Sequence, residues 1–453
     1  MSKWFGTHLI TALLLVALAV VLITPIVTIV IEGFVVDGQL SFGWLHDVLT
    51  FPPYWNGLVY SVLKAVLTTA LCLLLSIPLA MLANNLDFFG KRWWLALIQV
   101  PLIIPPFVGA LGMKGMLSRN GGINALLVHW GWIDWSQAVD WMQYKLAACV
   151  VLEALYLYPI TFLNVQAALA NIDPALDEAG QNLGAGGWRR FFRITLPLVR
   201  PGVFAGSTIV FIWSFTELGT PLMVGWEEVT AVQVFRMLQT TAPGGEAFAL
   251  VVVLLAASVM LYLVGKLVLG RPLGGMMAKA TVAAQTRRLS WRGSLLVTAP
   301  FALVFLIAVL PHIGVLLNSV SAIGQITLDP ANMTLRHHQT LLHDMFAFGE
   351  PGRGMAAVSI ANSFKYSIIA TAVDLVLGFA IAYLVVRRRS WSTSLLDHLA
   401  MLPLAVPGLV MAFGYFAMTQ PHSYLAQTVD PVLVPMLQFV DRFLADHGAR
   451  AAA

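Results

Sequence analysis

The chain has 453 residues, of which 59% are hydrophobic and 11% are charged, and its formal net charge at pH 7 is +4. A typical soluble domain carries about 25% charged residues, so this composition excludes an ordinary water-soluble protein. The basic excess fits the short cytoplasmic loops of a membrane protein better than a nucleic-acid-binding surface. Both cysteines, Cys72 and Cys149, lie within apolar runs, which argues against a disulfide framework or a metal site.

Nine apolar runs are long enough to cross a membrane as helices. They cover residues 9–31, 58–83, 94–113, 146–168, 200–224, 247–269, 294–317, 364–386 and 394–418. The first run is too long for a signal peptide, so we expect an uncleaved first span. Lys and Arg are roughly twice as frequent in one set of alternate loops as in the other, which predicts a cytoplasmic N-terminus.

Two distant parts of the chain resemble each other. LIQVPLIIPPFVGALGM (97–113) aligns with LAMLPLAVPGLVMAFGY (399–415) at an offset of 302, which pairs Pro101, Pro105, Ala110 and Gly112 with Pro403, Pro407, Ala412 and Gly414. Upstream, NGLVYS from Asn56 matches NSFKYS from Asn362, and Pro25 matches Pro311. The pattern predicts a tandem repeat of parallel orientation, which is common in membrane transporters.

The repeat suggests how the chain is divided. We expect a first half over residues 1–270 with about six spans, a cytoplasmic linker over 271–293, and a second half over 294–453 with about three. The counterpart of Glu178 would lie near position 480, beyond the last residue, so we expect the second copy to be truncated.

A polar segment, residues 171–197, separates the fourth and fifth runs. Asp173 is a good N-cap, Pro174 suits the first helical turn, and Asp177 and Glu178 favour a helix start. The short helix is expected to end at the glycines from Gly184 onward. A second amphipathic piece then leads back to the membrane near Pro197 and Pro201, so the sequence predicts a helix–turn–helix at the cytoplasmic face.

This segment contains Glu178-Ala179-Gly180, three residues, Gly184, nine residues, Ile194, one residue, and Leu196-Pro197. It resembles the EAA loop of ABC-importer permeases, E-A-A-x3-G-x9-I-x-L-P. Gly180 departs from the family pattern by replacing the second alanine, which weakens a helix by up to about 1 kcal/mol. The duplicated layout is similar to that of the fused permeases of ferric-iron and 2-aminoethylphosphonate importers.

The resemblance implies an all-α, polytopic transmembrane bundle with a MetI-like permease fold. It also implies that the Glu178–Gly184 helix docks on a cytoplasmic ABC ATPase dimer, and that a solute-binding protein outside delivers the solute. The sequence has no G-x-x-x-x-G-K-[ST] phosphate loop, so we expect no enzyme activity and no cofactor in this chain. The resemblance places it in a bacterial inner membrane, with ferric iron as the leading solute and 2-aminoethylphosphonate, polyamines or thiamine as alternatives.

Other readings stay open. An ion-coupled secondary transporter also uses repeats and intramembrane carboxylates, and a truncated permease could be non-functional. Glu153, Glu217 and Asp374 lie within or at the ends of apolar runs, so they are candidates for the solute path or for a structural hydrogen-bonding role. The histidines of RHHQTLLHDM (336–345) are expected in a solvated outer loop and not in a metal site.

Overall fold

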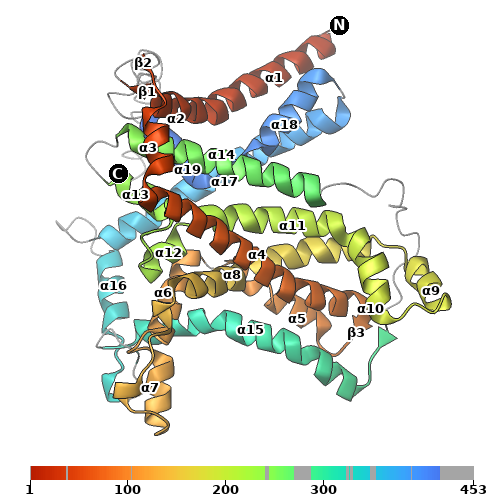
Figure 1. The fold of residues 1–453 in the computed structure, drawn as a ribbon, viewed down its shortest axis with the longest axis vertical. Coiled ribbons are helices and arrows are strands. Elements are labelled where there is room, and N and C mark those ends of the chain that lie inside the picture. Colours follow the sequence, from red (N-terminus) through yellow and green to blue (C-terminus); the bar gives the residue numbers. More distant parts are fainter. Residues whose placement is uncertain are drawn as a thin grey trace. The chain divides into compact units, whose positions relative to one another are not determined.

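The structure is a computed structural model that describes residues 2–36, 39–103, 105–239, 244–269, 287–322, 326, 330–346, 354–388 and 390–418. Residues 271–286 of the predicted linker and 419–453 of the predicted second half lie outside this part. The described chain consists of helices with four two-residue strands (Figure 1). The all-α fold that the composition predicts is therefore confirmed.

The elements follow the chain in this order up to the fourth predicted span: α1 Ser2–Leu18, η1 Ala19–Ile23, α2 Thr24–Phe34, β1 Val35–Val36, β2 Gln39–Leu40, α3 Gly43–Thr50, α4 Pro52–Asn85, β3 Leu86–Asp87, α5 Lys91–Leu97, η2 Val100–Ile103, α6 Pro106–Leu117, α7 Gly122–His129, η3 Trp135–Gln137, η4 Trp141–Gln143 and α8 Lys145–Ala170. The remaining elements are α9 Pro174–Asn182, α10 Gly187–Arg190, η5 Phe191–Thr195, α11 Leu196–Thr216, α12 Gly219–Val224, α13 Thr230–Leu238, α14 Gly245–Leu269, β4 Arg287–Arg288, α15 Trp291–Ser319, η6 Pro330–Asn332, α16 Arg336–Phe346, α17 Met355–Arg387, α18 Trp391–Ala405 and α19 Gly408–Met418. β1 pairs antiparallel with β2, and β3 pairs parallel with β4.

The chain divides into two compact units. As far as they are described, the first unit comprises Met1–Leu58, Gln233–Val259 and Leu377–Ala453, and the second comprises Val59–Val232 and Met260–Val376. Each unit takes segments from both halves of the predicted repeat. Packing therefore does not follow the order of the chain.

In the described part of the chain, seven helices are long and apolar enough to cross a membrane. They are His8–Phe34, Pro52–Asn85, Lys145–Ala170, Gly187–Thr216, Gly245–Leu267, Trp291–Ser319 and Met355–Arg387. Each contains most or all of one predicted span. In lipid the backbone cannot bond to water, so a segment satisfies all its amides and carbonyls locally only as a helix. The length of an apolar run therefore predicts a membrane helix well.

The predictions of one unbroken helix over 94–113 and over 394–418 are wrong. The first run forms α5, η2 and α6, and the axis bends by 95° at the break between Lys91–Ile103 and Pro106–His129. The second forms α18 and α19. A residue before proline is pushed towards extended backbone. Pro105 (ψ 133°), which precedes Pro106, and Val406 (ψ 125°), which precedes Pro407, both adopt it. The two breaks lie at the same place in the aligned copies, before Pro106 and before Gly408.

Close helix contacts also recur between aligned positions. In the second unit Gly112 of α6 lies against α15, where a Cβ atom on Gly112 would clash with the carbonyl oxygen of Pro311. In the first unit Gly414 of α19 lies against α2, where a Cβ atom would be 2.7 Å from the carbonyl oxygen of Pro25. The sequence alignment pairs these two glycines and these two prolines. The same contact is therefore built twice, each time between segments from different halves.

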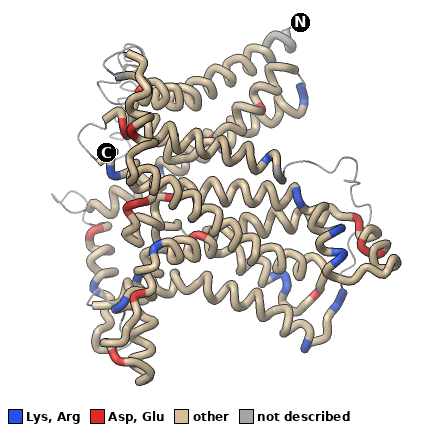
Figure 2. Tube along the Cα trace, in the orientation of Figure 1, with Lys and Arg blue, Asp and Glu red and all other residues tan. Residues whose placement is uncertain are grey.

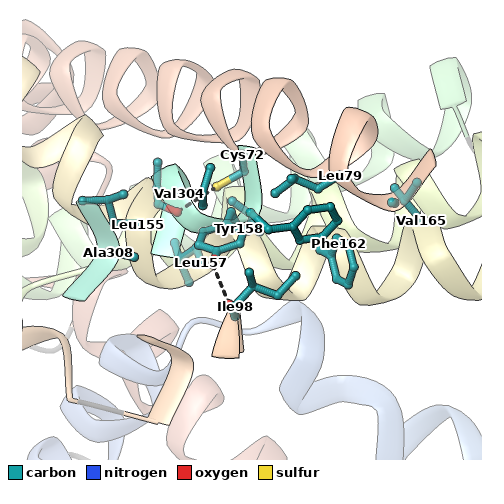
Figure 3. Close-up of a cluster of buried hydrophobic side chains, with 14 of the residues drawn as sticks. Cys72, Leu79, Ile98, Leu155, Leu157, Tyr158, Phe162, Val165, Val304 and Ala308 are labelled. Atoms are coloured by element: carbon teal, nitrogen blue, oxygen red, sulfur yellow. Dashed lines mark hydrogen bonds between the residues drawn. The ribbon is translucent and has the colours of Figure 1, made fainter. Parts of the chain in front are cut away.

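The core of the second unit lies among α4, α8 and their neighbours (Figure 3). Tyr158 on α8 is fully buried, and its hydroxyl donates to the carbonyl oxygen of Ile98 at 2.5 Å. Ser76 on α4 donates to the carbonyl oxygen of Tyr158 at 2.8 Å. Aliphatic side chains and Phe162 fill the space around Tyr158. This core holds α4 against α8 over several helical turns.

Candidate functional site

The segment between α8 and α11, residues 171–197, is called the EAA segment below. It begins with α9, whose N-cap is Asp173, and the Asp173 carboxylate accepts a hydrogen bond from the Ala175 amide at 3.0 Å. Pro174 occupies the first turn, where its missing N–H costs nothing. The helix start predicted from these residues is confirmed.

Gly184 ends this helix and reverses the chain. Its φ is +73°, a left-handed conformation that a residue with a Cβ atom adopts only with strain. The Gly184 amide donates to the carbonyl oxygen of Gln181 at 2.9 Å, and the Ala185 amide donates to that of Gly180 at 3.0 Å. These bonds satisfy carbonyls at the end of α9, as is usual for a glycine just after a helix.

Two positions of the sequence motif contact each other across this turn. Gly180 is buried, and a Cβ atom on it would lie 2.7 Å from Cδ1 of Ile194. The small residue at 180 therefore lets α9 approach η5 closely. The alanine of the family pattern would require the end of the Ile194 side chain to move, so the departure at Gly180 matches the packing found here.

An ion pair that sequence reasoning missed braces the same turn. The Arg190 guanidinium donates from Nη1 to Oδ2 of Asp177 at 2.9 Å, and Gln181 donates to the same oxygen at 2.9 Å. Asp177 and Arg190 are thirteen residues apart. No helical or strand spacing connects residues at that separation, so the sequence carries no local signal of the pair. With the Gly180–Ile194 contact, it fixes α9 relative to α10 and η5.

Several side chains of the EAA segment are exposed. Glu178 and Ala179 are exposed on α9, and the apolar side chains of Leu183 (88% exposed) and Trp188 (79%) follow them. The ring of Trp188 stacks on that of Phe192, with centroids 5.9 Å apart. Leu183, Trp188 and Phe192 thus leave apolar side-chain surface exposed on the segment that also exposes Glu178.

A cavity of about 890 Å³ lies between the segment and the end of α4. Glu178 and Gln181 line it from α9, and Asn84 and Asn85 line it from the end of α4. Arg287 of β4 lines it as well. The EAA segment is therefore held away from the end of α4, and it is fastened mainly through α8 and α11.

Leu196 and Pro197 open α11, with Pro197 in its first turn. Further along, Gly202 and Gly206 face α8, where Cβ atoms would lie 2.5 Å from the carbonyl oxygen of Asn164 and 2.9 Å from Cα of Thr161. Two glycines four residues apart allow close approach of membrane helices. The two helices that flank the EAA segment are thus packed backbone to backbone.

The three carboxylates predicted within or at the ends of the spans have different surroundings. Glu153 is fully buried and accepts hydrogen bonds from Lys64 Nζ, at 2.6 Å, and from the Ser214 hydroxyl. Glu217 accepts through Oε1 from the amides of Gly219, at 2.9 Å, and Thr220, at 3.2 Å, at the start of α12. Asp374 lies exposed on α17. A role of any of them in the solute path stays a prediction.

Residues 336–345, predicted as a solvated loop, form the helix α16, and most of them are exposed. Thr334 Oγ1 accepts from the Arg336 amide at 3.1 Å and acts as a cap at its start. His337 Nε2 lies 3.1 Å from the carbonyl oxygen of Ser321. Among the described residues, no group of three or more His, Cys, Asp or Glu side chains could hold a metal ion.

Comparison with known proteins gives this geometry a family. Residues 76–274, which include the whole EAA segment, match the family described as "Binding-protein-dependent transport system inner membrane component". The chain is 28% identical to the ferric transport system permease protein FbpB of Actinobacillus pleuropneumoniae over 388 residues, which are 84% of this chain and 54% of the relative. It thus spans about half the length of that ferric transport permease.

A second relative is covered more fully. The molybdenum transport system permease protein ModB of Haemophilus influenzae is 33% identical over 183 residues, which are 38% of this chain and 76% of the relative. A solved bacterial alginate ABC transporter in complex with a periplasmic protein is similar over 58% of this chain and 93% of its own, with a TM-score of 0.49 and 16% identity. On the family match and the ModB relative, the chain belongs to the binding-protein-dependent transport system inner membrane components.

Proposed function

We propose that this chain is the membrane-spanning permease subunit of an ATP-driven importer and that the EAA segment receives the force of a separate ATPase. The observation that carries this proposal is the geometry of the segment. Its motif residues form a short, braced helix with Glu178 and Ala179 exposed. A rigid helix fastened at both ends to membrane spans can transmit a displacement, whereas a floppy loop would absorb it.

The route of the force follows from the connections of the segment. α9 continues from α8, and η5 continues into α11. Because α8 and α11 pack through Gly202 and Gly206, a push on α9 would move both helices together. Closure of an ATPase dimer on ATP would then tilt this pair between inward and outward access. The ATPase dimer and the solute-binding protein outside are both proposed partners.

The charge distribution supports a cytoplasmic position for the EAA segment. Within the second unit, Lys and Arg gather at the end that carries α9 and α10 (Figure 2). This end includes Arg189, Arg190 and Arg193 of the segment and Arg287 and Arg288 of β4. Basic residues are enriched on the cytoplasmic side of membrane proteins. We therefore propose that this end is cytoplasmic. The Lys and Arg bias of the alternate loops supports the separate proposal that the N-terminus is cytoplasmic as well.

Ferric iron is the solute that we propose. Its support is the ferric transport permease that matches 84% of this chain, whereas the molybdenum transport permease matches 38%. We further propose two halves, 1–270 and 294–453, supported by the recurring helix breaks and by the paired glycine–proline contacts. 2-Aminoethylphosphonate, polyamines and thiamine are the competing solutes in the test below.

Cross-linking tests the docking of the segment. Ala179→Cys places a reactive thiol on the exposed surface of α9, and Leu341→Cys places one on exposed α16 as the matched control. Together with the partner ATPase in membranes, position 179 should cross-link to the ATPase and position 341 should not. Cross-links of position 179 to lipid alone during active import would contradict the proposal.

Transport assays test the coupling. Glu178→Lys and Gly184→Pro should abolish ATP-dependent uptake of radioactive ferric iron while ATP hydrolysis and membrane insertion persist. Gly187→Ala is the control, because Gly187 has no positive φ and open space around its Cα. An excess of each competing solute identifies the cargo by inhibition. Uptake that persists without ATP but stops when the ion gradient is removed would favour a secondary transporter.

A further inference from the structure

A buried polar cluster joins three membrane helices of the second unit. Lys64 comes from α4, Glu153 from α8 and Ser214 from α11, and all three side chains are fully buried. Lys64 Nζ donates to Oε1 of Glu153 at 2.6 Å, and the Ser214 hydroxyl donates to Oε2. Each oxygen of one carboxylate thus binds a different helix.

Stability alone does not account for this cluster. A buried ion pair gains little over apolar residues of the same size, because removing both charges from water offsets most of their attraction. The three helices also have other contacts, including Gly202 and Gly206 between α8 and α11 and the bond from Ser76 to Tyr158 between α4 and α8. Ionisable side chains within a membrane are expensive and therefore point to function.

The position of the cluster relative to the EAA segment is informative. Glu153 precedes the end of α8 by seventeen residues, and Ser214 follows the start of α11 by eighteen. At 1.5 Å per residue, both lie about 25 Å along their helices from the EAA segment. That distance is close to the thickness of the hydrocarbon core, about 30 Å. The cluster therefore ties the three helices together at the ends remote from the segment.

We infer that Lys64, Glu153 and Ser214 form a polar clasp that makes α4 follow α8 and α11 when the EAA segment moves. The inference rests on the proposed function and names positioning residues for it. A hydrogen-bonded ion pair adds a link of defined direction to the packing contacts, because its geometry is specific. α4 is continuous with neither end of the EAA segment, so the clasp supplies a directional link at its remote end.

The test compares variants that keep the cavity filled. Lys64→Met with Glu153→Leu replaces the pair with apolar side chains of similar size, and Lys64→Glu with Glu153→Lys restores a pair with the charges exchanged. Each is reconstituted in vesicles with the ATPase and the solute-binding protein. The readouts are the thermal unfolding temperature, the rate of ATP hydrolysis and the solute imported per ATP hydrolysed.

The apolar pair should keep the unfolding temperature and the ATP hydrolysis rate but import several-fold less solute per ATP. The exchanged pair should recover most of the loss, and Ser214→Ala should cause a smaller one. If the apolar pair imported as much solute per ATP hydrolysed as the wild type, the inference would be overturned. An exchanged pair that folds but does not raise the ratio above that of the apolar pair would also overturn it.

A second measurement does not depend on the ATPase. Spin labels at Leu63→Cys and Trp213→Cys, both on exposed positions next to the clasp, report the distance between α4 and α11, with Cys72 and Cys149 replaced by serine. The distance distribution should be narrow with the native pair and broad with the apolar pair. Equal widths would overturn the inference. A wild-type chain that imports nothing on ATP addition would refute the proposed function, while the label distances would still decide whether the clasp ties α4 to α11.

Discussion

Helices α4 and α17 carry related sequences but have opposite surroundings. The alignment of Asn56 with Asn362 pairs five positions along one face of α4 with five along one face of α17, and each set is called a stripe below. The α4 stripe is Ser61, Lys64, Thr68, Cys72 and Ser76, and the aligned α17 stripe is Ser367, Ala370, Asp374, Gly378 and Ala382. In α4 all five positions are fully buried. In α17 all five are exposed. Both helices therefore carry a stripe of small and polar residues in their sequences, but only the stripe of α4 is buried.

The stripe of α4 is buried because it faces α8. Three of the buried side chains of α4 bind this helix: Lys64 binds the Glu153 carboxylate, Cys72 approaches the Ala154 carbonyl oxygen at 3.7 Å, and Ser76 binds that of Tyr158. Among the described residues, no helix does the same for the stripe of α17. Polar side chains on a membrane helix stabilise packing where a second helix supplies hydrogen-bonding partners.

The largest difference between the two helices is expected for their lysines. Lys64→Met leaves the Glu153 carboxylate buried without a cation, which should cost about 3–5 kcal/mol of unfolding free energy. Lys365→Met on α17 removes an exposed charge and should change it by less than about 0.5 kcal/mol. Unfolding of the purified protein in detergent measures both. Equal losses of unfolding free energy in the two variants would show that the Lys64–Glu153 ion pair does not stabilise α4.

A smaller difference is expected for the glycines. Gly112→Ala on α6 places a methyl group against the carbonyl oxygen of Pro311, and such overpacking costs about 1–3 kcal/mol. Gly378→Ala on α17 meets no atom within 4 Å and should be neutral or stabilising by up to about 1 kcal/mol, because alanine favours helix. Denaturant midpoints report the comparison. A destabilised Gly378→Ala would mean that α17 has a close neighbour after all.

The hydroxyl groups should differ by less. Ser76→Ala removes the bond to the Tyr158 carbonyl oxygen and should cost about 1 kcal/mol. The reverse change at the aligned position, Ala382→Ser, adds an exposed hydroxyl and should have almost no effect. Thermal unfolding of the two variants, measured side by side, would contradict the comparison if their shifts were the same.

The smallest effect is expected for Asp374→Asn. The side chain is exposed, so stability should change by less than about 0.5 kcal/mol. Uptake is measured in parallel, because a residue of the solute path would lower uptake and leave the unfolding temperature unchanged. A clear loss of stability would instead reveal a packing partner of α17.

Much of the fold could be predicted from the sequence. Seven spans follow from apolar length, and the start of α9 at Asp173 and Pro174 follows from capping chemistry. The two broken spans were missed, although Pro105, Pro106 and Pro407 were visible in the sequence. Proline is tolerated within many membrane helices, including α4 at Pro78 and α8 at Pro159. Whether it bends or breaks a helix depends on what re-satisfies the freed carbonyls.

Part of the candidate site could be predicted from the sequence and part could not. The motif from Glu178 to Pro197 marks the EAA segment, and Gly184 has the left-handed turn expected where a helix ends in glycine. The Asp177–Arg190 brace and the Gly180–Ile194 contact became visible only in the fold, because each joins residues more than a helical turn apart. Glu153 shows the same limit, since its partner Lys64 lies 89 residues away.

The sequence by itself determined seven segments that are helical and apolar enough for a membrane, and where the polar EAA segment interrupts them. These properties depend on hydrophobicity, capping and backbone preference, which act over a few residues. The tertiary structure alone decided which stripe of each helix is buried, which proline breaks a span and which charges pair. Those outcomes depend on a neighbour from elsewhere in the chain, and no local pattern identifies that neighbour.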